Sequence, residues 1–254
     1  MPVLKTESLC KDFMGLRAID RLDFTVEEGE IHGLIGPNGS GKTTFFNLVS
    51  GLFPATEGKI YFESADITKL PPHTITKMGI SRTFQIARIM DRMNCLDNVM
   101  AGLHCRTRTD IFGTIFRLPF THSSQEKRME KRAIELLEFV GLENAAQRSA
   151  THLVWVETQL LQIARALATE PRLLLLDEPT AGMGSTESQQ VQKIIKHINE
   201  LGVTVVVVSH DIRLIIGVSD AITVIEFGKK IAEGTPEQIQ NNPHVLEAYL
   251  GKEE

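Results

Sequence analysis

The sequence has few cysteines and no long apolar run, and both shortages narrow the class of protein. Its 254 residues contain three cysteines, an odd number without the spacing of a metal site: Cys10, Cys95 and Cys105. We therefore expect inert, reduced thiols in a reducing compartment. The longest apolar runs, such as Val203–Val208, have the length of a strand and are too short to span a bilayer. The N-terminal residues contain no basic stretch followed by an apolar region, so no signal peptide is predicted.

An excess of positive charge is also missing. The chain has 27 Lys and Arg against 32 Asp and Glu, a formal net charge of -5, which argues against nucleic acid as its main partner. With 42% hydrophobic and 23% charged residues the composition is that of an ordinary globular protein. The length allows one large domain or two modest ones with a substantial core.

Two parts of the chain, Val3–Phe84 and Leu173–Gly234, alternate short apolar runs with helical patterns, as in an α/β sheet. Arg172–Leu176 and Val203–Val208 lack polar alternation, which favours central parallel strands buried on both faces. Other strands are predicted in pairs: Leu4–Leu9 and Ile19–Val26 as sheet-edge strands joined by a turn, and Ala221–Glu226 with Lys230–Glu233 as a hairpin through Gly228.

From about Ile86 to Leu167 the pattern becomes helical. The charged run Glu126–Arg132 is predicted to be the solvated face of a helix. Ile111–Phe120 is unusually apolar for a connection; we expect a packed loop, with a docking surface for a membrane partner as the alternative. The apolar positions at helical spacing are Met129, Ala133, Leu136, Leu137 and Val140.

A complete Gly-x-x-x-x-Gly-Lys-Thr phosphate loop lies between the apolar run Ile31–Ile35 and a helical segment that begins at Thr44. Backbone N–H groups of such a loop curl around a polyphosphate, and the helix N-terminus adds its positive dipole end. Lys42 would reach and stabilise the outer phosphates, and the Thr43 hydroxyl would ligate Mg²⁺. A tight glycine turn without a ligand is the alternative, but strand, loop and helix agree on binding of a nucleoside triphosphate. The predicted nucleotide-binding residues are Gly36, Pro37, Asn38, Gly39, Ser40, Gly41, Lys42, Thr43 and Thr44.

Two carboxylates, Asp177 and Glu178, end the Leu-rich strand Leu173–Leu176. Asp177 would act on the Mg²⁺ of the phosphate loop through its water shell. Glu178 would lie beside the γ-phosphate and polarise an attacking water. The alternative, a cap for the next helix, is disfavoured because the strand is buried and a metal-binding loop is present.

Three further residues are candidates on weaker signals. His210 follows Val203–Val208 at the carboxyl end of a central strand, where α/β sheets bind ligands, and it would hydrogen-bond the γ-phosphate. Gln85 ends the first α/β part, and its carbonyl would contact Mg²⁺ and report it to the helical part. Phe13 would stack on the adenine ring, although a place in the core fits its pattern equally well.

In this order and spacing the motifs resemble those of the ATP-binding subunit of an ABC transporter, over essentially the whole chain. More narrowly the chain resembles the longer ATPase type of branched-chain amino acid importers. The segments that carry this narrower resemblance are Gly79–Gln85, the insertion Ile111–Arg117, Asp177–Met183, Gly234–Ile239, Asn241–Pro243 and Glu247–Gly251.

The resemblance implies an α/β P-loop ATPase fold with a mostly parallel central sheet, an N-terminal antiparallel β part and a helical subdomain. Residues 1–85 and 166–235 would form the ATP-binding core, 86–165 the helical subdomain and 236–254 a C-terminal helical tail. It also implies a Mg²⁺-dependent ATPase on the cytoplasmic face of the membrane. Its partners would be a second ATPase subunit, two membrane permeases and, indirectly, an extracytoplasmic solute-binding protein. A conformational clamp with slow hydrolysis and a regulatory role is the alternative function.

The chain departs from the family where a Leu-Ser-Gly-Gly-Gln signature is expected. In the family this signature of one subunit completes the ATP site of the other, and here the aligned residues are Leu153–Glu157. Val154 lacks the hydroxyl that would bond the γ-phosphate, and Val156, in place of a glycine, tolerates a positive φ poorly. Gly184 also stands where the family has an Asp or Asn. We favour an asymmetric heterodimer over a homodimer, although backbone amides at Glu157 would still hold phosphate at a cost of about 1.5–3 kcal/mol.

Overall fold

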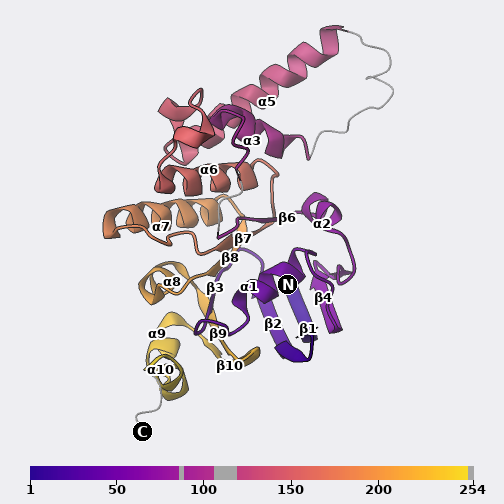
Figure 1. The fold of residues 1–254 in the computed structure, drawn as a ribbon, viewed down its shortest axis with the longest axis vertical. Helices are drawn as coiled ribbons and strands as arrows, with labels where there is room; N and C mark the ends of the chain where they lie inside the picture. Colours follow the sequence, from indigo (N-terminus) through magenta and orange to yellow (C-terminus); the bar gives the residue numbers. More distant parts are fainter. Residues whose placement is uncertain (86–88, 106–118, 251–254) are drawn as a thin grey trace. The chain divides into compact units, whose positions relative to one another are not determined.

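The computed structural model describes residues 1–85, 89–105 and 119–250, the side chains of 119–124 and of residue 250 excepted. They fall into two compact units, Met1–Gln85 with Arg172–Glu254, and Ile86–Pro171 (Figure 1). The first unit contains both sheets and the second is helical, which confirms the predicted α/β class. Most of the apolar stretch Ile111–Phe120 lies outside the described residues.

The central sheet of the first unit has six strands in the order β10-β9-β3-β8-β7-β6. All pairings from β9 to β6 are parallel, and β10 alone pairs antiparallel, with β9. Every residue of β3, β7 and β8 is buried, as expected for strands that are covered on both faces. The strands are β3 (Ile31–Ile35), β6 (Ile80–Arg82), β7 (Leu173–Asp177), β8 (Thr204–Val208), β9 (Ala221–Glu226) and β10 (Lys229–Gly234).

A second, antiparallel sheet has the order β2-β1-β4-β5. Because β1 lies between β2 and β4, the prediction of Leu4–Leu9 as an edge strand is wrong; Ile19–Val26 does lie in the edge strand β2. The strands β1, β2 and β4 contribute buried side chains, whereas both residues of β5 are exposed; β4 and β5 were not singled out from the sequence. The four strands are β1 (Pro2–Phe13), β2 (Leu16–Glu27), β4 (Glu57–Phe62) and β5 (Ala65–Asp66).

Helix α1 (Lys42–Val49) lies in the core between the two sheets. Its Phe45 and Phe46 belong to one apolar cluster with Phe24 of the antiparallel sheet and Val206 of the central sheet. Phe24 and Phe45 meet edge to face, with ring centroids 4.7 Å apart. The helix that follows the phosphate loop is therefore fixed by burial on both sides. The other helices of this unit are α2 (Pro72–Met78), α7 (Ser185–Glu200), α8 (Ile212–Val218), α9 (Pro236–Gln240) and α10 (Pro243–Leu250).

The second unit buries the apolar faces of its helices against one another. Of the predicted apolar positions in and just beyond α5, Ala133, Leu136, Leu137 and Val140 are buried and Met129 is half-buried. The predicted charged face is exposed. None of the described helices is long and apolar enough to cross a bilayer. The elements are α3 (Cys95–Leu103), α5 (Pro119–Phe139), α6 (Trp155–Leu167) and the short 3-10 turns Glu143–Ala145 and Ala150–His152.

Candidate active site

Strand register brings the predicted catalytic segments to one edge of the central sheet. Leu34 of β3 and Asp177 of β7 both stand opposite Val208, the last residue of β8, which runs between them. The phosphate loop after β3, Glu178 after β7 and His210 after β8 therefore leave the sheet side by side. This carboxyl edge is where open parallel sheets bind ligands.

The phosphate loop is held in shape by its own lysine. The Lys42 ammonium donates to the backbone carbonyls of Gly36 and Pro37 at 2.7 and 2.9 Å, and its side chain is buried. Burial lowers the pKa of Lys42, while the charges of Asp177 and Glu178 act in the opposite direction. The cation thus lies within electrostatic reach of both predicted carboxylates.

Close backbone approaches explain two glycines, one within the loop and one in a turn that contacts it. Gly41 has a φ of 108°, and a Cβ there would lie 2.8 Å from the Ala18 carbonyl oxygen. Gly228, in the β9–β10 turn, donates its N–H to Ser40 O at 2.9 Å, and its carbonyl accepts from Asp20 N–H at 3.0 Å. One turn therefore connects the phosphate loop with strand β2 of the other sheet.

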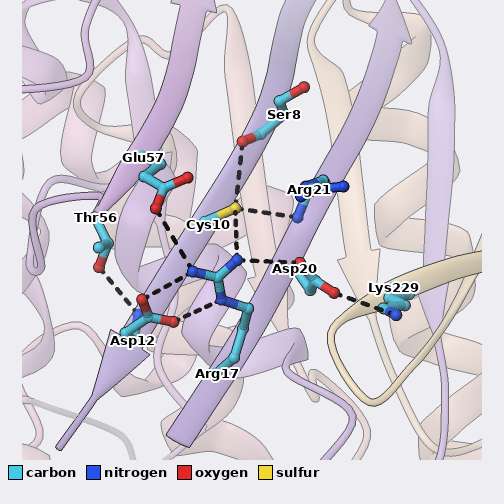
Figure 2. Close-up of polar contacts among 9 residues, drawn as sticks. All are labelled: Ser8, Cys10, Asp12, Arg17, Asp20, Arg21, Thr56, Glu57 and Lys229. Carbon is cyan, nitrogen blue, oxygen red and sulfur yellow. Dashed lines mark hydrogen bonds and ion pairs between the residues drawn. The ribbon is translucent and has the colours of Figure 1, made fainter. Parts of the chain in front are cut away.

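An ionic network reinforces this seam at the surface (Figure 2). Arg17 donates from Nε and Nη2 to the two carboxylate oxygens of Asp12, at 2.9 and 3.1 Å, and from Nη1 to Asp20 at 3.4 Å. Lys229, the residue after Gly228, lies 3.2 Å from the second oxygen of Asp20. Hydrogen bonding to Arg17 lowers the pKa of Asp12. The network links the end of β1, beside Phe13, to the turn that contacts the phosphate loop.

Asp177 is buried and paired with a cation. Its Oδ2 accepts from Arg82 Nη2 at 2.7 Å, and both side chains are at most 5% exposed. Its Oδ1 is buried and accepts no hydrogen bond from any residue that the structure describes. One carboxylate oxygen is thus fixed and the other is left as a candidate ligand.

Glu178 and His210 contact each other directly. His210 Nδ1 lies 2.7 Å from Glu178 Oε2, and the His210 backbone N–H donates to the same oxygen at 3.2 Å. Glu178 has a φ of 51°, in the left-handed region that non-glycine residues seldom occupy, and its N–H donates to Val208 O at 2.8 Å. The Glu178 side chain is 9% exposed and that of His210 is 64% exposed, so the pair reaches from the interior to the surface. Such backbone outliers gather at functional sites.

The remaining predicted site residues are placed less tightly. Thr43, Asn38 and Gly39 are exposed along the loop, and Thr44 is half-buried in the first turn of α1. Gln85 is exposed three residues after β6.

Phe13 is not a core residue. It is 37% exposed at the end of β1, where its ring meets Phe53 edge to face at 5.6 Å and lies 5.0 Å from the Lys11 ammonium. The core alternative for Phe13 is therefore wrong, and an accessible aromatic platform remains.

Two residues near this site were missed from the sequence. Arg82 is adjacent to the Thr83–Gln85 segment, but nothing in the pattern indicated its pairing with Asp177. Tyr249 of α10 has a buried hydroxyl without a hydrogen bond among the described residues. Burial raises the pKa of Tyr249 to about 12, with the backbone of Gly36 opposing and the charge of Glu178 adding to the rise. The C-terminal helix therefore reaches the edge of the site.

In the helical unit, the altered signature segment is the start of α6. Val154 precedes the helix in an extended conformation, and Val156 is helical with no positive φ. Glu157 accepts the Val154 N–H at 3.0 Å and forms an ion pair with Arg148, whose hydrogen bond lowers the pKa of Glu157. This helix N-terminus therefore already has a carboxylate of its own.

Comparisons with known proteins place the whole chain in one family. Residues 19–181 match the ABC transporter family, and residues 229–254 match the family described as branched-chain amino acid ATP-binding cassette transporter. The chain is 39% identical to the high-affinity branched-chain amino acid transport ATP-binding protein BraF of Pseudomonas aeruginosa, covering 99% of this chain and 98% of that protein. It is 37% identical to LivG of Escherichia coli K12, a protein with the same description and the same coverage.

A solved structure of an ATP-binding cassette has a similar fold. The ADP conformation of MJ1267, an ATP-binding cassette of an ABC transporter, is 31% identical with a TM-score of 0.86, covering 99% of this chain and 100% of that one. The protein is thus an ATP-binding cassette and belongs to the ABC transporter family of ATPases.

Proposed function

We propose that this chain hydrolyses ATP to drive an importer of branched-chain or chemically related amino acids. The cargo is supported by the match of residues 229–254 to the branched-chain family and by the names of the relatives BraF and LivG. The chain would lie at the inner face of the membrane on two permease subunits, with a solute-binding protein on the other side. The net charge of -5 gives no reason to add nucleic acid to these partners.

The phosphate loop would bind the triphosphate. Its amides and the first-turn N–H groups of α1, which have no partners within the helix, would surround the phosphates. The Lys42 ammonium would exchange its contacts with the Gly36 and Pro37 carbonyls for the outer phosphates, and so offset their negative charge. Phe13, exposed at the end of β1, would stack on the adenine.

The donor set fits Mg²⁺. The Thr43 hydroxyl and the unpaired Asp177 Oδ1 are hard oxygen ligands, as Mg²⁺ requires, and Gln85 would add a carbonyl. Within the described residues no group of three or more His, Cys, Asp and Glu side chains could hold a metal, so the phosphates would supply further ligands. Bound there, Mg²⁺ would neutralise charge on the β- and γ-phosphates.

Glu178 and His210 would prepare the water. Glu178, with one oxygen held by His210 and its own backbone fixed to Val208, would orient and polarise the attacking water with its second oxygen. In the imidazolium form both ring nitrogens of His210 are donors, so Nδ1 would donate to Glu178 and Nε2 to the γ-phosphate. The 2.7 Å contact between these two side chains is the observation that supports hydrolysis most directly.

We infer further that two unlike ATPase subunits form the working pair. The signature helix of this chain offers Val154 in place of a hydroxyl, and the Val154 N–H is already bonded to Glu157. A phosphate at this helix N-terminus would meet the charge of Glu157, which disfavours it. The partner's ATP would therefore turn over slowly, while this chain's own ATP, completed by an intact partner signature, would be hydrolysed.

The test is the ATPase rate of the protein alone and with an ATPase subunit that has an intact signature. The isolated protein, limited to its own homodimer, should hydrolyse weakly and should accelerate strongly with the partner; equal rates would overturn the asymmetric pair. Trp155, the sole tryptophan, should change its fluorescence on ATP-driven pairing, and a flat signal would remove it from the interface.

A regulatory clamp with slow hydrolysis is the competing function. Purification with membrane permease subunits, together with ATPase activity stimulated in that complex, is expected for the importer. A protein that purifies without permeases and hydrolyses slowly with every partner would favour the clamp.

A further inference from the structure

Arg82, the last residue of β6, connects two elements of the site through one guanidinium group. Nη2 donates to Asp177 Oδ2 at 2.7 Å, and Nη1 donates to Asn47 Oδ1 at 2.7 Å and to Ser50 Oγ at 3.2 Å. Asn47 belongs to α1 and Ser50 follows its last turn. The cation therefore bridges the helix of the phosphate loop and the strand that ends in Asp177.

Two aromatic rings restrict the same group. Arg82 Cζ lies 5.4 Å from the ring centroid of Phe46 and 5.0 Å from that of Phe84, and the side chain is 5% exposed. A planar guanidinium that lies against two rings and donates to several acceptors has little freedom to reorient.

The geometry matters for Asp177 because only one of its oxygens is engaged. Oδ2 is fixed by Arg82, and Oδ1 is buried with no partner among the described residues. The bond from the guanidinium to Oδ2 fixes the plane of the carboxylate, and with it the direction in which Oδ1 points. Partners that orient a metal ligand typically change metal affinity 10- to 100-fold when they are removed.

The bridge also reaches the other predicted metal ligand. Asn47 is four residues after Thr43, and residues at this spacing lie on one face of a helix. By bonding to Asn47 and Asp177 together, Arg82 holds the face of α1 that contains Thr43 at a fixed separation from the Asp177 carboxylate.

We propose that Arg82 is the positioning residue of the metal site, orienting Asp177 and fixing its distance from Thr43. The proposal rests on the proposed function, since it assigns a role toward the Mg²⁺ of that site. A purely structural ion pair predicts a different result, because its loss would lower stability without a selective effect on the metal.

The experiment measures equilibrium binding of mant-AMP-PNP, a fluorescent and non-hydrolysable ATP analogue, in excess Mg²⁺ and in EDTA. The ratio of the two dissociation constants gives the contribution of Mg²⁺. In Arg82→Gln this contribution should fall about tenfold or more, with affinity in EDTA unchanged, since Arg82 has no predicted contact with the nucleotide. Asn47→Ala, which removes one acceptor and no charge, should show a smaller loss in the same direction.

Arg172→Gln is the matched control. Arg172 also pairs with a carboxylate, Glu63, donates to a carbonyl, Met78 O at 2.7 Å, and covers a ring, Phe62 at 5.3 Å, but it has no contact with Asp177. It should bind the analogue like the wild type in both conditions.

Three outcomes would overturn the proposal. An unchanged Mg²⁺ contribution in Arg82→Gln, which includes equal losses of affinity in Mg²⁺ and in EDTA, would reduce Arg82 to a structural residue and leave the proposed function standing. A wild-type protein without any Mg²⁺ contribution would instead refute the metal site itself. If circular dichroism shows that Arg82→Gln does not fold, Asn47→Ala is the deciding variant. A Mg²⁺ contribution in Asn47→Ala equal to that of the wild-type protein would then overturn the proposal.

Discussion

The turn at Gly228 offers a sharp test of how the phosphate loop is held. At a φ of 77°, a Cβ at this position would lie 2.6 Å from Ala18 O and 2.9 Å from both Ala18 C and Ile19 Cα. All three atoms are backbone, so no flexible side chain can yield. Gly228→Ala should therefore lose about 1–2 kcal/mol from the left-handed conformation and about 1–3 kcal/mol more from overpacking.

Gly202→Ala separates the cost of the left-handed conformation from the cost of the clash. Gly202 has a φ of 89° with nothing within 4 Å of the Cβ position, so it has the same backbone strain without the clash. Reduced entropy of the unfolded chain offsets about 0.4–1 kcal/mol in both variants. Urea denaturation followed by circular dichroism should therefore find Gly228→Ala less stable than Gly202→Ala by about 1–3 kcal/mol.

The two variants should also differ in function. To relieve the clash the turn must move away from β2, which weakens the bond from Gly228 N–H to Ser40 O in the phosphate loop. ATP affinity should fall in Gly228→Ala and stay normal in Gly202→Ala. Equal stabilities, or a normal ATP affinity in both variants, would refute the view that this turn holds the loop in place.

Three further predictions concern the site and the signature helix. Glu178→Gln should bind ATP normally but hydrolyse it about 100-fold or more slowly in a phosphate-release assay, and unaltered turnover would remove Glu178 from its role. Phe13→Ala should weaken the binding of ATP by about 1–3 kcal/mol in calorimetry and leave the binding of tripolyphosphate unchanged. Equal losses of affinity for the two ligands would contradict stacking on the adenine. Glu157→Ala should cost about 1 kcal/mol at pH 7 in urea denaturation through the lost helix cap. Because Arg148 lowers the pKa of Glu157 from 4.5, that difference should be complete above pH 4.5 and disappear as the pH falls below it; a difference that persists at low pH would contradict the charged cap.

The sequence by itself determined the fold class and the chemically specialised segments. Glycines at fixed spacing, an unbroken apolar strand before Asp177 and a buried strand before His210 each follow from local rules that hold in any context. The same rules predicted the buried face of α5. They failed for β1, because whether a strand lies inside a sheet or at its edge depends on which strands pair with it.

The tertiary structure decided which side chains meet. The pairing of Arg82 with Asp177 joins residues 95 apart in sequence, and the contact of His210 with Glu178 depends on the register of two parallel strands. Phe13 was equally compatible with the core and the surface until its neighbours were placed. A sequence pattern reports how each segment prefers to fold, but distances between segments arise only when burial and hydrogen bonding of the whole sheet are satisfied together.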